Sequence, residues 1–220
     1  MAFDPKTGLA EAETLMLDMD GTVLDLAYDN YMWLRHLPAR YAEKQGISVE
    51  AARRDLLARY GAVQGSLTWY CLDHWSERLG LDVFRLHQDE RHRIGYLPGA
   101  RDFLERMRDA AVRVLLVTNS HPDTLRLKDE VTGLFAYFDG VYSAHHFGYA
   151  KECREFWDAL RAETAFDPAT TMFVDDSHPV LESARDYGIR KLVAVTRPDT
   201  SVAPRDSAGF VGIEGVRDLG

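Results

Sequence analysis

Two aspartates carry the sharpest chemical signal in the sequence. Asp18 and Asp20 directly follow a short apolar run at residues 15–17. Side chains two positions apart on an extended segment point the same way, so both carboxylates can face one reacting centre. Open parallel sheets bind their ligands beyond the carboxyl ends of the strands. We therefore expect residues 18–22, with the sequence DMDGT, to form part of a ligand site.

Two further apolar runs also end in polar side chains, and a lysine opens another helical segment. These residues are Thr118 and Asn119 after residues 114–117, Asp175 and Asp176 after residues 172–174, and Lys151. Four carboxylates that converge on one sheet edge repel one another unless a cation lies between them. Oxygen ligands without His or Cys favour a hard ion, and Mg²⁺ commonly combines a few carboxylates with water and phosphate oxygens. The sequence thus predicts Mg²⁺ as a cofactor.

This set of groups suits the hydrolysis of a phosphate monoester. Asp18 would attack phosphorus and form an aspartyl phosphate. Mg²⁺ and Lys151 would neutralise charge, while Thr118 and nearby backbone N–H groups would hold the oxygens that are not transferred. Asp20 would protonate the departing alkoxide and later activate the water that hydrolyses the intermediate.

Each of these motifs also has a structural interpretation when it is taken alone. Asp-Gly is mainly a turn signal, the acids at 175–176 can cap a helix, and most lysines are solvated surface groups. Their occurrence together, at the ends of three strand candidates in a compatible order, is what favours catalysis.

The elements that must position these residues form an α/β pattern. Apolar runs rich in Val, Leu and Ile alternate with amphipathic helical segments, which predicts a Rossmann-like, doubly wound parallel sheet. The expected strands are residues 14–17, 112–117, 141–143, 171–174 and 191–195, with a weaker signal at 210–213. Residues 26–96 show helical patterns and no convincing strand. We expect them to form a helical cap inserted into a core of residues 1–25 and 97–220.

Composition and charge narrow the range of partners. Apolar residues make up 46% and charged residues 28% of the 220 residues, as in soluble globular proteins. The net charge of −9 disfavours nucleic-acid polymers but allows a small phosphorylated metabolite. Cys71 and Cys153 have no disulfide or zinc spacing, and no signal or membrane segment is recognisable. We expect a cytoplasmic protein; its oligomeric state is not readable from the sequence.

The combined motifs resemble those of the haloacid dehalogenase superfamily. There the first motif is Asp-x-Asp-Gly-Thr, the second a Thr or Ser after a strand, the third a Lys and the fourth an acidic pair. The resemblance implies a helical, C1-type cap and Mg²⁺ held by Asp18, the backbone carbonyl of Asp20 and the acids at 175–176. Asp20 points to phosphatases or phosphomutases, because dehalogenases lack this residue. We assign phosphate contacts to Asp18, Gly21, Thr22, Thr118, Asn119 and Lys151.

A finer resemblance runs from about residue 14 to 200 and is to the bacterial GMP/IMP nucleotidase family. It rests on residues 17–26, 29–31, 69–73, 118–122 and 147–152. Two positions depart from the family pattern, with Ala150 where Pro is expected and Ser120 where Ala is expected. The resemblance implies hydrolysis of purine nucleoside 5′-monophosphates to nucleoside and phosphate.

The expected cap is rich in aromatic rings that carry a polar edge. Nine of the fourteen Tyr and Trp residues lie within it, and such rings either stack on a base or pack the cap's own helices. Our candidates for substrate contact are Tyr28, Asn30, Tyr70 and His121. Three alternatives stay open: a phosphatase for another metabolite such as phosphoglycolate or a sugar phosphate, a phosphomutase, and a ligand-binding protein that has lost catalysis.

Overall fold

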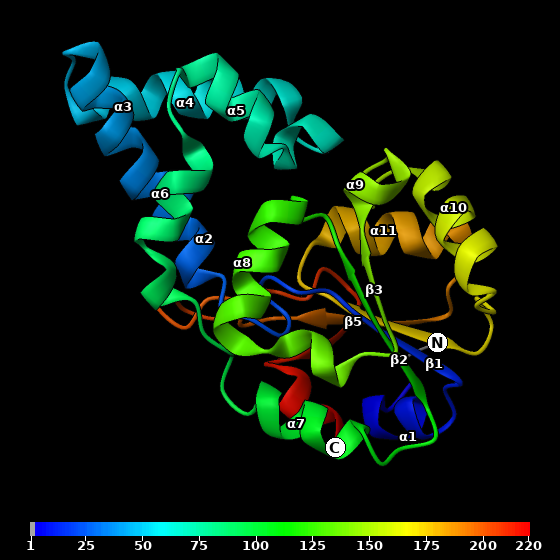
Figure 1. The fold of residues 1–220 in the computed structure, drawn as a ribbon. Coiled ribbons are helices and arrows are strands. Elements are labelled where there is room, and N and C mark those ends of the chain that lie inside the picture. The colour runs from blue at the N-terminus through cyan, green and yellow to red at the C-terminus, as the bar shows by residue number, and fades with distance from the viewer. Residues whose placement is uncertain (1–2) are drawn as a thin grey trace.

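The computed structural model describes residues 3–220. Their centre is a six-stranded parallel sheet in the order β3-β2-β1-β4-β5-β6 (Figure 1). The strands are β1 (Thr14–Leu17), β2 (Arg113–Thr118), β3 (Gly140–Ser143), β4 (Thr171–Asp175), β5 (Lys191–Val195) and β6 (Val211–Ile213). The predicted α/β fold is confirmed, and the weak signal near residue 210 corresponds to the edge strand β6.

Helices of the core cover both faces of this sheet. They are α1 (Pro5–Ala10), α7 (Ala100–Met107), α8 (Pro122–Thr132), α9 (Ala144–Phe147), α10 (Arg154–Thr164) and α11 (His178–Tyr187), with 3₁₀ turns η4 (Leu134–Tyr137) and η5 (Val216–Leu219). Pro122 and Pro179 stand in the first turns of α8 and α11, where a missing N–H costs little. Both helices therefore begin directly behind strand-end loops.

The central strands are buried on both sides, which explains their continuous apolar sequences. In β1, Leu15 and Leu17 pack in the apolar layer that includes α1, α7 and α8, and Met16 packs in the opposite layer with α9, α10 and α11. All four residues of β1 are buried. This rigid centre fixes the loop that follows β1.

The segment between β1 and β2 is helical. Its elements are α2 (Ala27–Tyr31), the π-helical turn η1 (Met32–His36), α3 (Leu37–Gln45), α4 (Val49–Val63), η2 (Leu67–Tyr70), α5 (Leu72–Leu79), α6 (Val83–Asp89) and η3 (Arg91–Arg93). Much of it packs around its own apolar cluster, and α3, α4 and α5 stand apart from the sheet (Figure 1). Within residues 3–220, no helix has both the length and the apolarity that crossing a bilayer requires.

The helical insert joins the core through two paired segments. Leu24, where the chain enters the insert, forms an antiparallel bridge with Tyr96, where the chain returns to the core. Next to this bridge, the N–H of Asp25 donates to the carbonyl of Gly95 at 2.9 Å. Leu24 also bridges to Asp20. The attachment of the insert is therefore continuous with the loop that carries the DMDGT motif.

Candidate active site

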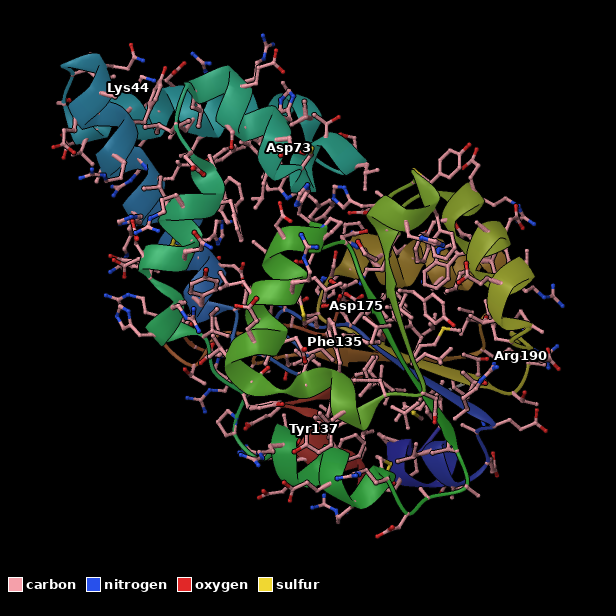
Figure 2. All side chains as sticks on the ribbon, viewed as in Figure 1. Lys44, Asp73, Phe135, Tyr137, Asp175 and Arg190 are labelled. Carbon is pink, nitrogen blue, oxygen red and sulfur yellow. The ribbon has the colours of Figure 1, made fainter. Side chains whose placement is uncertain are left out.

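A cavity of about 350 Å³ lies between the carboxyl edge of the sheet and the helical insert. The strands β2, β1 and β4 are neighbours and end beside it, at the point where the chain changes direction across the sheet. Seven residues of the predicted core set line it: Asp18, Asp20, Thr118, Asn119, Lys151, Asp175 and Asp176. Figure 2 shows Asp175 in the core, below the helix α5 that carries Asp73.

Lys151 is buried among acidic groups. Its Nζ donates hydrogen bonds to Oδ1 of Asp18 at 2.5 Å, Oδ2 of Asp175 at 2.7 Å and the carbonyl of Val117 at 3.0 Å. Burial by itself would lower the pKa of Lys151, but the carboxylates of Asp175 and Asp18 raise the pKa above its usual value. The ammonium therefore stays charged beside the proposed nucleophile.

Three buried carboxylates form a compact group of oxygen donors. Asp18, Asp175 and Asp176 each offer one oxygen within 4.8 Å of the others. Burial raises the pKa of Asp18 well above its usual value, and both neighbouring acids add to the rise although Lys151 opposes it. Burial and Asp175 also raise the pKa of Asp176 to about 7. A hard divalent cation such as Mg²⁺ fits this donor set, because it supplies the charge that the crowded carboxylates lack.

The carboxylate of Asp20 lies outside that group of three and has a different partner. Its Oδ1 accepts a hydrogen bond of 2.7 Å from Nζ of Lys128, which also donates to both oxygens of Asp29 at 2.9 Å. Asp29 lines the cavity. Lys128 and Asp29 were not among the predicted site residues. A lysine 108 residues from Asp20 on an ordinary helix carries no motif, and Asp29 entered only through the family resemblance. The metal role predicted for Asp20 concerns its backbone carbonyl and stays a prediction.

Two residues predicted to contact phosphate, Gly21 and Thr22, are not among the residues that line the cavity. Gly21 has φ of 85°, and a Cβ there would lie 2.7 Å from Cγ of Asp176, so only glycine allows this close approach. Oγ1 of Thr22 is buried and has no hydrogen-bond partner within residues 3–220. Thr118 does line the cavity, and its Oγ1 accepts from the N–H of Ser120 at 3.0 Å.

Asn119 lines the cavity and also makes two hydrogen bonds within the protein; its predicted phosphate contact stays a prediction. Its Oδ1 accepts from the backbone N–H of Lys151 at 2.9 Å, and its Nδ2 donates to Oε2 of Glu152 at 3.0 Å. The side chain thus fixes the loop that carries Lys151. Arg205, another residue that the sequence did not reveal, donates to the carbonyl of Asp176 and, at 2.8 Å, to its Oδ2.

Of the four substrate candidates, Asn30, Tyr70 and His121 line the cavity. Tyr28, the fourth candidate, is not among the residues that line the cavity, and its predicted substrate contact stays a prediction. Tyr28 is 3% exposed, and its hydroxyl lies 2.8 Å from Nδ1 of His87 and donates to the carbonyl of His87 at 3.2 Å. This side chain packs between helices α2 and α6.

The wall of the cavity that the insert contributes is aromatic and apolar. Trp33, Trp69 and Tyr70 are half-buried there, whereas Tyr60 and Trp75 are buried behind them. The ring of Tyr60 meets those of Trp69 and Trp75 edge-on, with centroids 5.5 and 4.9 Å apart. The rings therefore pack the insert and also leave aromatic surface toward the cavity.

Comparison with known proteins agrees with this architecture. The family model described as haloacid dehalogenase-like hydrolase matches residues 12–209. The chain belongs to this hydrolase family.

Among individual relatives, the GMP/IMP nucleotidase YrfG of Escherichia coli strain K12 is 40% identical over 195 residues, which cover 89% of this chain and 88% of that protein. A haloacid dehalogenase-family phosphatase from Thermococcus onnurineus superimposes with a TM-score of 0.78 at 23% identity, covering 94% of this chain and 95% of that one. YfnB of Bacillus subtilis, a putative hydrolase solved with bound magnesium, gives a TM-score of 0.65 at 19% identity over 95% and 97% of the two chains. The two structures share the fold.

Proposed function

We propose that the protein is a Mg²⁺-dependent phosphomonoesterase that hydrolyses purine nucleoside 5′-monophosphates, GMP and IMP foremost, to nucleoside and phosphate. One observation carries this proposal: a buried Asp18–Lys151–Asp175 cluster at the sheet edge faces an aromatic wall of the helical insert across one cavity. The identity to a GMP/IMP nucleotidase supports the choice of substrate.

The side chains divide the reaction among them. Asp18 attacks phosphorus and forms the aspartyl phosphate, while Lys151 neutralises charge on the phosphoryl oxygens. Thr118 holds an oxygen that is not transferred. Asp20 protonates the leaving oxygen and then takes a proton from the hydrolytic water. Mg²⁺, when held by Asp18, Asp175 and Asp176, adds positive charge that offsets repulsion between the carboxylates and the substrate dianion.

Residues 26–96 serve as the cap in this proposal, and residues 1–25 and 97–220 as the catalytic core. The cap supplies Trp33, Trp69 and Tyr70 to the cavity, and rings of this kind stack on a nucleobase while they leave the phosphate to the core. A volume of about 350 Å³ lies within the range of small-molecule sites.

A substrate panel tests the proposal. Phosphate release is measured with Mg²⁺ for AMP, GMP, IMP, phosphoglycolate and several sugar phosphates, and kcat/KM is expected to be highest for GMP and IMP. The nucleotidase assignment fails if all three nucleotides stay intact while a sugar phosphate turns over well. Chromatography of the products separates hydrolysis from a mutase reaction, which would yield an isomeric ester in place of inorganic phosphate.

A further inference from the structure

Lys128 on α8 is a buried lysine that the proposed chemistry has not yet used. It is 1% exposed, and its Nζ lies between two carboxylates, 2.7 Å from Oδ1 of Asp20 and 2.9 Å from each oxygen of Asp29. It does not line the cavity. Lysine is rarely buried completely, and a buried ion pair is often no more stable than well-packed apolar residues would be. Stability alone therefore accounts poorly for this arrangement.

We propose that Lys128 is a positioning residue that holds the carboxyl group of Asp20 in the orientation from which it donates its proton to the leaving group. The inference rests on the role of Asp20 in the proposed function. The hydrogen bond from Lys128 engages Oδ1, and within residues 3–220 no hydrogen bond engages Oδ2 of Asp20. One oxygen is thus anchored, and the other is available on a side chain that lines the cavity.

Asp29 anchors the ammonium from the opposite side. It belongs to α2, the first helix of the insert, and it takes two of the hydrogen bonds that Lys128 makes. The neighbouring Tyr28 ring lies 5.5 Å from Nζ, and its hydroxyl is held at His87 of α6. Nζ is therefore held by groups from two elements, the loop after β1 and α2. Asp29 thus shares the positive charge of Lys128 with Asp20.

The orientation matters at one step of the reaction. As the bond between phosphorus and the ester oxygen breaks, the electron pair goes to that oxygen, and the proton on Oδ2 of Asp20 moves to it. A nucleoside alkoxide needs this proton. The p-nitrophenolate ion leaves without one, so the two ester classes report separately on proton donation and on phosphoryl transfer.

The test compares kcat/KM for the best alkyl phosphate of the substrate panel with kcat/KM for p-nitrophenyl phosphate. This parameter covers the steps through departure of the leaving group. In Lys128→Met, kcat/KM for the alkyl phosphate is expected to fall roughly 100-fold, because general acid catalysis contributes about 10²–10⁴-fold. The value of kcat/KM for the aryl phosphate should fall far less. Asp20→Asn should shift the ratio of the two kcat/KM values in the same direction.

Two matched variants separate positioning from a general loss of structure. Asp29→Asn keeps the contact between Lys128 and Asp20 but weakens the second anchor of the ammonium, so the ratio of the two kcat/KM values should shift in the same direction as in Lys128→Met and by less. Lys191→Met removes a lysine that is paired with Glu11 at 3.3 Å, away from the cavity. This variant should leave kcat/KM for both substrates unchanged. If Lys128→Met does not fold, the double variant Lys128→Met/Asp29→Asn, which removes one charge of each sign, replaces it.

Equal losses for the alkyl and aryl phosphates in a folded Lys128 variant would overturn the positioning role. An unchanged kcat/KM for the alkyl phosphate would overturn this role as well. Neither result depends on which alkyl ester the protein prefers. If nucleotides fail in the panel while another monoester is hydrolysed, only the nucleotide assignment is lost and the ratio is measured with that ester.

Discussion

The hydroxyl of Tyr70 donates a hydrogen bond of 2.8 Å to Oε1 of Glu152 and so joins the helical insert to the core beside the cavity. Burial, reinforced by Glu152, raises the pKa of Tyr70, so the hydroxyl stays protonated. The other oxygen of Glu152 accepts from Asn119, which also holds the backbone of Lys151. A continuous chain of hydrogen bonds therefore connects the insert to the loop that carries Lys151.

Tyr70→Phe is expected to lower kcat/KM about tenfold, mainly through a higher KM, because a hydrogen bond to a charged acceptor contributes about 1.5–3 kcal/mol. Steady-state kinetics with the best substrate measures the change. Tyr41→Phe is the matched control, since its hydroxyl bonds Asp55 within the insert. Equal effects of the two substitutions would show that the link between insert and core has no special role.

Asp18→Asn should abolish measurable turnover and leave the protein folded. The amide has the shape of the carboxylate, and its oxygen can still accept the hydrogen bond from Lys151, but it cannot attack phosphorus. Phosphate release and circular dichroism check the two halves of the prediction. Asp158→Asn removes an exposed carboxylate paired with Arg154 and should keep full activity. Undiminished turnover in Asp18→Asn would rule out an aspartyl phosphate on this residue.

The metal-free protein should lose stability as pH rises from about 4 to about 7. In this window the folded protein keeps protons on Asp18 and Asp176, whose pKa values are raised, whereas the unfolded chain releases them. The folded state then binds more protons, so the free energy of unfolding falls with rising pH. The stabilising contribution of Asp176 is complete below about pH 4 and is lost as pH passes about 7. Calorimetry in the presence of a chelator measures this slope.

Mg²⁺ should raise Tm more at about pH 8 than at about pH 5, because it competes with these protons for the same oxygens. Asp176→Asn should flatten the pH dependence of the chelated protein, and Asp186→Asn, which alters an exposed carboxylate, should not. A Tm increase that is the same at both pH values, or absent, would argue against a cation at the three-carboxylate site.

The sheet and the placement of the core motifs could be predicted because both follow from local patterns. Continuous apolar runs mark buried parallel strands, and residues that directly follow such a strand, such as Asp18 and Asp176, must lie at its carboxyl end. Convergence in one cavity then follows from the neighbouring positions of β2, β1 and β4. The catalytic and metal-binding roles of these residues stay predictions.

The buried partners of these residues could not be predicted, since they depend on which helix faces come together. Lys128 lies on α8, and its two acids lie in other elements, so no local spacing relates them. Arg205 reaches Asp176 from a loop before β6. The contact of Tyr28 with His87 was not predictable for a related reason: an aromatic next to a motif can point into a helix interface as readily as into a site.

The aromatic wall yields the most direct test of nucleotide recognition. Trp69 is half-buried, lines the cavity and packs against Tyr60 in the apolar cluster of the insert, so Trp69→Ala removes stacking surface and leaves the residues at the sheet edge unchanged. Stacking of a base on an aromatic ring contributes about 1–3 kcal/mol, which predicts a loss of roughly 5- to 150-fold in kcat/KM for GMP and IMP. The value of kcat/KM for ribose 5-phosphate, which lacks the base, should fall much less. Steady-state kinetics with both kinds of substrate measures the difference. Tyr137→Ala, which removes a half-buried ring in η4 outside the cavity, serves as the control for a lost ring. If Trp69→Ala lowers kcat/KM equally for GMP and ribose 5-phosphate, this ring supports the structure of the insert and does not contribute to recognition of the base.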